Sequence, residues 1–98
     1  MKLVFADAAW EDDLYWQKQD RKMVERINKL IRETQREPFD GVGKPEPLKH
    51  ALAGFWSRRI TEEHRMVYRV EGDALLIAQL RYHYLSRPGT SFGRFLKS

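Results

Sequence analysis

The chain has 98 residues, the length of a single domain, and no cysteine, which excludes disulfide bonds and thiolate zinc sites and favours a reducing cytosol. Its 42% hydrophobic and 12% aromatic residues exclude a disordered chain, and the lack of a leader or a long apolar run predicts a cytoplasmic protein without membrane segments. The net charge of +4 indicates an anionic partner only weakly. Its distribution says more, because residues 44–84 carry seven basic and five acidic side chains, whereas residues 1–20 carry two basic and five acidic ones.

The N-terminal half predicts a strand and two helices. Residues 2–5 have the composition of a short strand, and Asp7 is the expected N-cap of a helix that ends near residue 19. Asp20 is the expected N-cap of a second helix, which Pro38 ends. This second helix has an apolar stripe with helical spacing, made of Met23, Ile27, Leu30, Ile31 and Thr34. The simplest role for the three tryptophans is packing (Trp10, Trp16 and Trp56).

The C-terminal half predicts a meander of strands. A glycine- and proline-rich loop spans residues 40–47, and a turn of helix can follow at 48–52. Residues 55–60, 65–70 and 74–82 read as three antiparallel strands, which the N-terminal strand joins. We therefore expect an α+β fold with two helices on one face of an antiparallel sheet of about four strands. Residues 1–84 would form this domain, and residues 85–98 would be a flexible or appended basic tail.

Strand alternation predicts a cationic face at the end of the meander. If residue numbers of paired positions sum to about 144–146, Arg65 lies near Gln79 or Arg81, with His83 just beyond on the same side. Arg59 could join them from the preceding strand. Like charges placed side by side are unfavourable, so such a face indicates a bound anion such as phosphate.

Three side chains within residues 44–84 suffice for RNA cleavage without a metal ion. Glu46 can take a proton from a ribose 2′-OH, Arg65 can hold the charge that builds on the phosphate, and His83 can return a proton to the departing 5′-oxygen. The histidines lack HxH or HxxxH spacing, so we expect no metal site and no cofactor.

Each of these residues also has a structural interpretation that spacing alone leaves open. Glu46 could be a solvated loop acid, Arg65 could pair with Glu62 or Glu63, and His83 could be a surface histidine. Two tyrosines at the strand end could pack at a sheet edge (Tyr82 and Tyr84), and His64, on the opposite face of its strand, would be incidental. From the residues alone, the chain is a basic α+β domain suited to binding RNA.

Three runs carry a resemblance to a known family: GKPEPLKH at 43–50, GFWSRRITEEHR at 54–65 and RYHY at 81–84. With them, residues 1–84 resemble the YoeB toxins of the RelE superfamily. The resemblance implies a microbial-ribonuclease-like fold and a ribosome-dependent endoribonuclease that cuts mRNA in the ribosomal A site. It implies Glu46 as general base, Arg65 as the transition-state arginine, His83 as general acid and Tyr84 as the residue that closes the site. Phosphate-binding positions would be Lys49, Arg59 and Arg81.

The same resemblance implies the partners. They are a cognate YefM-like antitoxin with an acidic segment that folds on binding, the 70S ribosome with its mRNA, and in some members a second toxin copy. Two other activities remain open: a non-catalytic module that blocks translation by occupying the ribosome, and a free-standing ribonuclease that degrades naked RNA.

Overall fold

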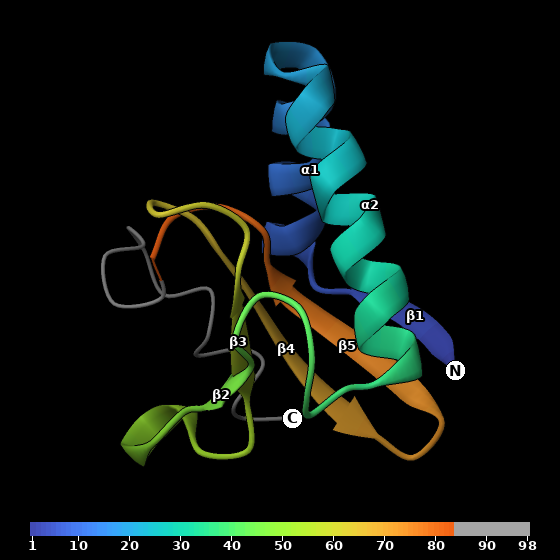
Figure 1. Cartoon of the computed structure of the whole chain (residues 1–98), viewed down its shortest axis with the longest axis vertical. Helices are drawn as coiled ribbons and strands as arrows, with labels where there is room; N and C mark the ends of the chain where they lie inside the picture. The colour runs from blue at the N-terminus through green and yellow to red at the C-terminus, as the bar shows by residue number, and fades with distance from the viewer. Residues whose placement is uncertain (84–98) are drawn as a thin grey trace.

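The computed structural model describes residues 1–83, which form two helices and a five-stranded sheet (Figure 1). The strand order across the sheet is β1-β5-β4-β3-β2, with β1 parallel to β5 and the remaining neighbours antiparallel. In chain order the elements are β1 (Lys2–Phe5), α1 (Asp7–Gln19), α2 (Arg21–Arg36), β2 (Glu46–Pro47), a 3₁₀ turn (His50–Leu52), β3 (Trp56–Arg59), β4 (Arg65–Glu71) and β5 (Ala74–Gln79).

The α+β class and the placement of the helices are confirmed, but the expected number of about four strands is one too low. The missing strand is β2, which lies in the segment expected to be a loop. Glu46 and Pro47 pair there with Ser57 and Trp56 of β3. Proline donates no hydrogen bond, so its position on this edge strand leaves the sheet's ladder intact.

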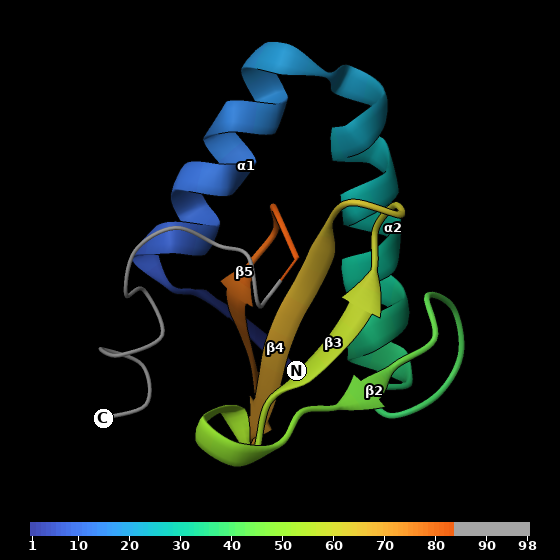
Figure 2. The same cartoon turned by 90° about the vertical axis from the view of Figure 1, so that its left-hand side faces the viewer.

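The main core lies between the helices and one face of the sheet. α1 and α2 form a hairpin joined at Asp20 (Figures 1 and 2). Four of the five residues in the predicted apolar stripe of α2 are buried: Ile27, Leu30, Ile31 and Thr34. The three aliphatic residues among them pack with strand residues that include Met66, Tyr68, Leu75 and Ile77. Burying each large aliphatic side chain contributes about 1.5–3 kcal/mol, so the stripe is a main source of stability.

Of the two N-caps predicted from the sequence, the structure confirms one and not the other. The Asp20 carboxylate accepts a hydrogen bond from Met23 N at 3.2 Å and caps α2 as expected. The expected cap at Asp7 is wrong, because α1 begins at Asp7 itself and Ala6 is its N-cap. Asp7 thus lies in the first turn, where the positive end of the helix dipole favours a carboxylate. Trp16 is buried as expected, and Trp10, although 50% exposed, packs its ring edge-on against Phe5 of β1 with 6.3 Å between the ring centroids.

A buried arginine ties the loop after α2 to the sheet. Arg58 of β3 is fully buried, and its guanidinium donates to carbonyl oxygens of the loop (Glu37, Asp40 and Val42) and to the hydroxyl of Tyr68. Burial raises the pKa of Tyr68, although Arg58 acts in the opposite direction, so the hydroxyl stays neutral and donates to Pro38 O at 2.5 Å. This cluster fixes the loop that leads into β2.

The last strand ends three residues earlier than expected. β5 stops at Gln79, and a bulge changes its register against β4: Tyr68 pairs with Ile77, but Val67 pairs with Gln79. These pairs sum to 145 and 146, within the predicted range. Ala78 is left without a partner, so the side-chain alternation shifts by one residue. The predicted common face of Gln79, Arg81 and His83 therefore does not form as a strand face.

Two further expectations concern the C-terminal residues and membrane segments. Tyr84 and the expected tail at residues 85–98 lie outside the described residues. Neither helix within residues 1–83 is long and apolar enough to cross a membrane.

Candidate active site

The face of the sheet opposite the helices, which we call the open face, gathers an acid and two arginines from three strands. A small buried cluster lies on the same side of the sheet: Leu48, Phe55, Val67 and Ala78. Glu46 pairs with Ser57, Ser57 pairs with Val67, and Arg59 pairs with Arg65. Directly paired residues project to the same side, and so do residues two apart on one strand. Glu46, Arg59 and Arg65 consequently share one face, as alternation predicted for the arginines. Glu46 and Arg59 are diagonal neighbours, for which the spacing is about 7–8 Å, and Arg65 lies opposite Arg59 on the next strand.

Arg65 is held at one end of its guanidinium by the hairpin before β4. Its Nη1 donates to the carbonyl oxygens of Thr61, Glu62 and His64 at 2.7, 3.0 and 3.2 Å. Among residues 1–83, the ion pairs do not include one between Arg65 and Glu62 or Glu63; Glu62 instead lies 3.7 Å from Arg59. Because Arg59 and Arg65 are cross-strand neighbours of like charge, an anion between them would relieve their repulsion.

Glu46 and Lys49 lie at the outer edge of the same sheet. Both are exposed, Glu46 on β2 and Lys49 immediately before the 3₁₀ turn. A hydrogen bond from Leu48 N to Phe55 O at 2.9 Å holds the segment between them against the chain leading into β3. The exposed carboxylate is accessible to a large substrate.

His83 is placed beside Arg65 by the backbone that precedes it. Arg65 N donates to Tyr82 O at 3.0 Å, although β5 has already ended, so His83 starts next to the first residue of β4. The His83 side chain is partly buried. The fold thus brings His83, the candidate general acid, and Arg65 to the same corner of the sheet.

Arg81 does not join this group. Its guanidinium carbon lies 3.5 Å from the centre of the Tyr15 ring of α1 and 4.6 Å from that of Tyr82. Alternation would have placed Arg81 with Arg65, but the chain leaves the strand at Gln79 and Tyr82 has a φ of +68°. The positive charge of Arg81 is thereby directed toward α1.

Sequence reasoning missed the two side chains that hold Tyr82. His64 Nδ1 accepts a hydrogen bond from Tyr82 N at 2.8 Å, and Gln79 Nε2 donates to Tyr82 O at 2.9 Å. The expectation that His64 is incidental is wrong. Its partner is 18 residues away along the chain, so no local spacing signal could have identified it.

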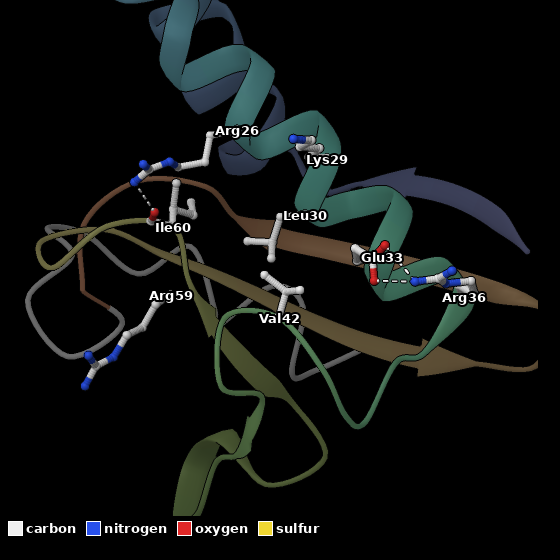
Figure 3. A pocket seen from close by; sticks show the side chains of 8 residues that line it. All are labelled: Arg26, Lys29, Leu30, Glu33, Arg36, Val42, Arg59 and Ile60. Carbon is white, nitrogen blue, oxygen red and sulfur yellow. Dashed lines mark hydrogen bonds and ion pairs between the residues drawn. The ribbon is translucent and has the colours of Figure 1, made fainter.

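A second basic surface lies on the other side of β3, between α2 and the loop before β2. Leu30, Val42 and Ile60 form its apolar part, and its rim carries Arg26, Lys29, Glu33, Arg36 and Arg59 (Figure 3). We call this surface the α2 groove. Arg26 donates to Ile60 O at 3.0 Å, and Glu33 pairs with Arg36 at 2.8 Å, so the one acid of the rim is already neutralised. The groove therefore suits an anionic segment with some apolar side chains.

A metal ion has no evident place among the described residues. Within residues 1–83, no three histidine or carboxylate side chains are grouped closely enough to hold one. What the open face offers is a carboxylate, two arginines and a neighbouring imidazole.

The arrangement of two helices on one side of a sheet is shared with solved bacterial toxins. The YoeB/ParE toxin from Agrobacterium tumefaciens superimposes with a TM-score of 0.84 at 57% identity, covering 86% of this chain and all of that one. YoeB of Staphylococcus aureus, solved as a dimer and in complex with YefM, gives TM-scores of 0.80 and 0.79 at 45% and 44% identity, each covering 86% of this chain and 98% of that one.

Sequence comparison identifies the family. Toxin YoeB of Escherichia coli K12 is 63% identical over 84 residues, which cover 86% of this chain and the whole of that protein. Residues 5–84 match the model of the YoeB-like toxin of bacterial type II toxin–antitoxin systems. The chain belongs to this toxin family, as its three sequence runs predicted.

Proposed function

We propose that this toxin is an endoribonuclease that cleaves mRNA in the ribosomal A site by metal-free acid–base catalysis and so inhibits translation. The observation that carries the proposal is the shared open face of Glu46 and Arg65, with His83 starting beside Arg65. A module that only bound RNA would need the arginines but would have no use for an exposed acid and an imidazole next to them.

The proposed reaction is a transfer of the phosphodiester to the ribose 2′-oxygen. Glu46 removes the proton of the 2′-OH, and the oxygen attacks the adjacent phosphorus. The bond from phosphorus to the 5′-oxygen breaks, and His83 gives its proton to that oxygen. The products are a 2′,3′-cyclic phosphate and a 5′-hydroxyl. Arg65 stabilises the charge that builds on the non-bridging oxygens of the phosphate.

The remaining predicted site residues have supporting roles in this proposal. Lys49 and Arg59 bind phosphates at the edge of the open face, and Tyr84 closes the site. Arg81, which stacks on Tyr15, would bind a phosphate only after leaving that ring, so we assign it the weakest contribution.

The open site explains why a ribosome would be needed. Glu46 is exposed on an edge strand, and an exposed acid does little by itself to hold a flexible RNA in one position. Holding the reacting oxygen in line with the phosphorus can contribute about 7–11 kcal/mol to a reaction, and the ribosome would supply this positioning.

Primer extension on mRNA in programmed 70S ribosomes tests the proposal. We expect discrete cuts in the codon at the A site and slow degradation of the same RNA without ribosomes. Stalled ribosomes with intact mRNA would instead identify a non-catalytic translation blocker. Rapid degradation of naked RNA would identify a free-standing ribonuclease.

A chain that stops at Tyr84 is expected to cleave mRNA on ribosomes faster than the full chain. The Escherichia coli relative is covered completely by 84 residues, whereas this chain continues for fourteen residues beyond the proposed site residue Tyr84. Residues joined directly to Tyr84 would hinder the closing role that we propose for its side chain. Single-turnover cleavage rates of the two forms make the comparison, and equal rates would contradict a role for the tail.

The proposal includes a YefM-like antitoxin and, as in the Staphylococcus aureus relative, a homodimer. An acidic antitoxin segment would be drawn to the cationic open face and to the α2 groove. Exposed apolar side chains on β1 and α1 suit a further protein contact: Leu3, Val4, Trp10 and Leu14.

Replacing Lys29 by Glu is expected to weaken binding of a YefM-type antitoxin about tenfold, because the reversed charge repels an acidic segment in the α2 groove. Lys22→Glu is the matched control, since Lys22 is an exposed lysine of the same helix that does not line the groove. Titration calorimetry measures both. Equal weakening by the two variants would show a general charge effect and no specific role for the groove.

A further inference from the structure

Hydrogen bonds from α1 and β4 hold the segment between the end of β5 and His83, which lies outside regular structure. Asp12 Oδ2 accepts a hydrogen bond from Leu80 N at 2.9 Å, and Trp16 Nε1 donates to Leu80 O at 2.9 Å. Both side chains come from α1, four residues apart and therefore on one face of the helix. Leu80 is buried, so these bonds lie away from water.

Two residues further along, the backbone of Tyr82 is bound from both sides. Its N–H donates to His64 Nδ1, and its carbonyl oxygen accepts from Arg65 N and from Gln79 Nε2. Tyr82 also has a φ of +68°, a region that costs a residue with a side chain about 1–3 kcal/mol. Such a backbone conformation persists only when its surroundings impose it, and the residue it orients next is His83.

We propose that His64 is a positioning residue: by accepting the Tyr82 N–H it fixes the backbone from which His83 projects, and so aims the general acid at the departing oxygen. This role rests on the proposed function of His83. His64 itself touches neither substrate nor the reacting atoms in this scheme. Its ring is placed by Trp16, whose centroid lies 4.9 Å away in an edge-on contact.

The geometry requires one form of the imidazole. To accept from Tyr82, Nδ1 must lack a proton, so His64 is neutral with its proton on Nε2. Burial lowers the pKa of His64 below its usual 6.5; Arg81 and Arg65 act in the same direction, and Glu63 and Asp12 oppose it. The surroundings thus favour the form that the hydrogen bond needs.

Two substitutions of His64 test its hydrogen-bond acceptor separately from its aromatic ring. In His64→Phe the ring can keep its edge-on contact with Trp16 but loses the acceptor. In His64→Asn the amide oxygen occupies the position of Nδ1, one bond from Cγ, and restores the acceptor without the ring. A merely structural histidine would tolerate Phe at least as well as Asn, whereas a positioning acceptor predicts the opposite order.

The experiment measures single-turnover mRNA cleavage on ribosomes over a range of toxin concentrations. We expect His64→Phe to lower the maximal rate by about 10²-fold, because a misplacement of about 1 Å has an effect of that size, while the half-saturating concentration changes less than twofold. His64→Asn should recover most of the rate. Wild-type cleavage by folded His64→Phe, or equal loss in both variants, would overturn the proposal.

Nuclear magnetic resonance of the free protein gives a readout that does not need activity. We expect a coupling through the hydrogen bond between the Tyr82 amide nitrogen and His64 Nδ1, and His83 ring signals that move in His64→Phe and return in His64→Asn. A protonated Nδ1, or His83 signals unchanged in both variants, would overturn the positioning role. If these signals behave as expected but the wild-type chain never cuts mRNA, the proposed function fails and the positioning of His83 stands.

Discussion

Replacing Glu46 by Gln is expected to lower the rate of mRNA cleavage on ribosomes by about 10²–10⁴-fold, the usual effect of removing one general base. The amide has nearly the same shape and size, but it cannot take the proton of the 2′-OH. The Glu46 side chain is exposed on an edge strand and makes no described hydrogen bond or ion pair, so the loss should appear in the rate and not in the free energy of unfolding.

The same measurement on His83→Gln should give a loss in the same range, because the departing oxygen then leaves without a proton. Glu25→Gln is the matched control, an exposed glutamate of α2 that lines neither the open face nor the α2 groove. Residues that act in one step are not additive, so the double variant should be little slower than the worse single one. Full cleavage by Glu46→Gln would remove Glu46 from the mechanism as general base.

The part of the site that the sequence predicted correctly depends on short-range rules. Arg59 and Arg65 pair across one tight hairpin, so the alternation of two adjacent strands is enough to place them on one face. The helices followed from the apolar stripe and from the cap at Asp20, which are local as well. The strand of Glu46 was missed because a two-residue edge strand with a proline has no periodicity to detect.

The corner that carries His83 could not be predicted, because contacts between distant segments determine it. A bulge at Ala78 shifts the alternation of β5, and Tyr82 then adopts a positive φ. Spacing rules assume that a strand continues with unchanged register, so they extended β5 through residue 82. The contacts that end it come from α1 and from His64, between 18 and 68 residues away in sequence.

Arg58 shows the same limit at another position. In the sequence it is one of two adjacent arginines, and only the one on the open face was considered for function. The structure separates them by alternation: Ser57 and Arg59 project to the open face, while Trp56 and Arg58 project to the helix side. Burial of Arg58 then depends on loop carbonyls that no local pattern reveals.

Replacing Arg58 by Leu is expected to lower the free energy of unfolding by about 2–4 kcal/mol, because partly buried carbonyl oxygens and the Tyr68 hydroxyl lose their donor. An apolar side chain fills the space but cannot donate. Arg58→Lys should recover only part of the loss, since one ammonium group lacks the planar fork that reaches several acceptors at once. Urea unfolding followed by tryptophan fluorescence measures all three chains.

Arg59→Leu is the matched control, one residue away on the same strand. Arg59 is exposed and its ion pair with Glu62 spans 3.7 Å, so its loss should change the free energy of unfolding by less than about 1 kcal/mol. At a temperature where both variants are folded, Arg59→Leu should lower the rate of mRNA cleavage more than Arg58→Leu does. The reason is that Arg59 faces the proposed substrate and Arg58 does not. If the urea midpoint of Arg58→Leu equals that of the wild type, water must satisfy the loop carbonyl oxygens in the variant. Arg58 would then not be what fixes the loop before Glu46.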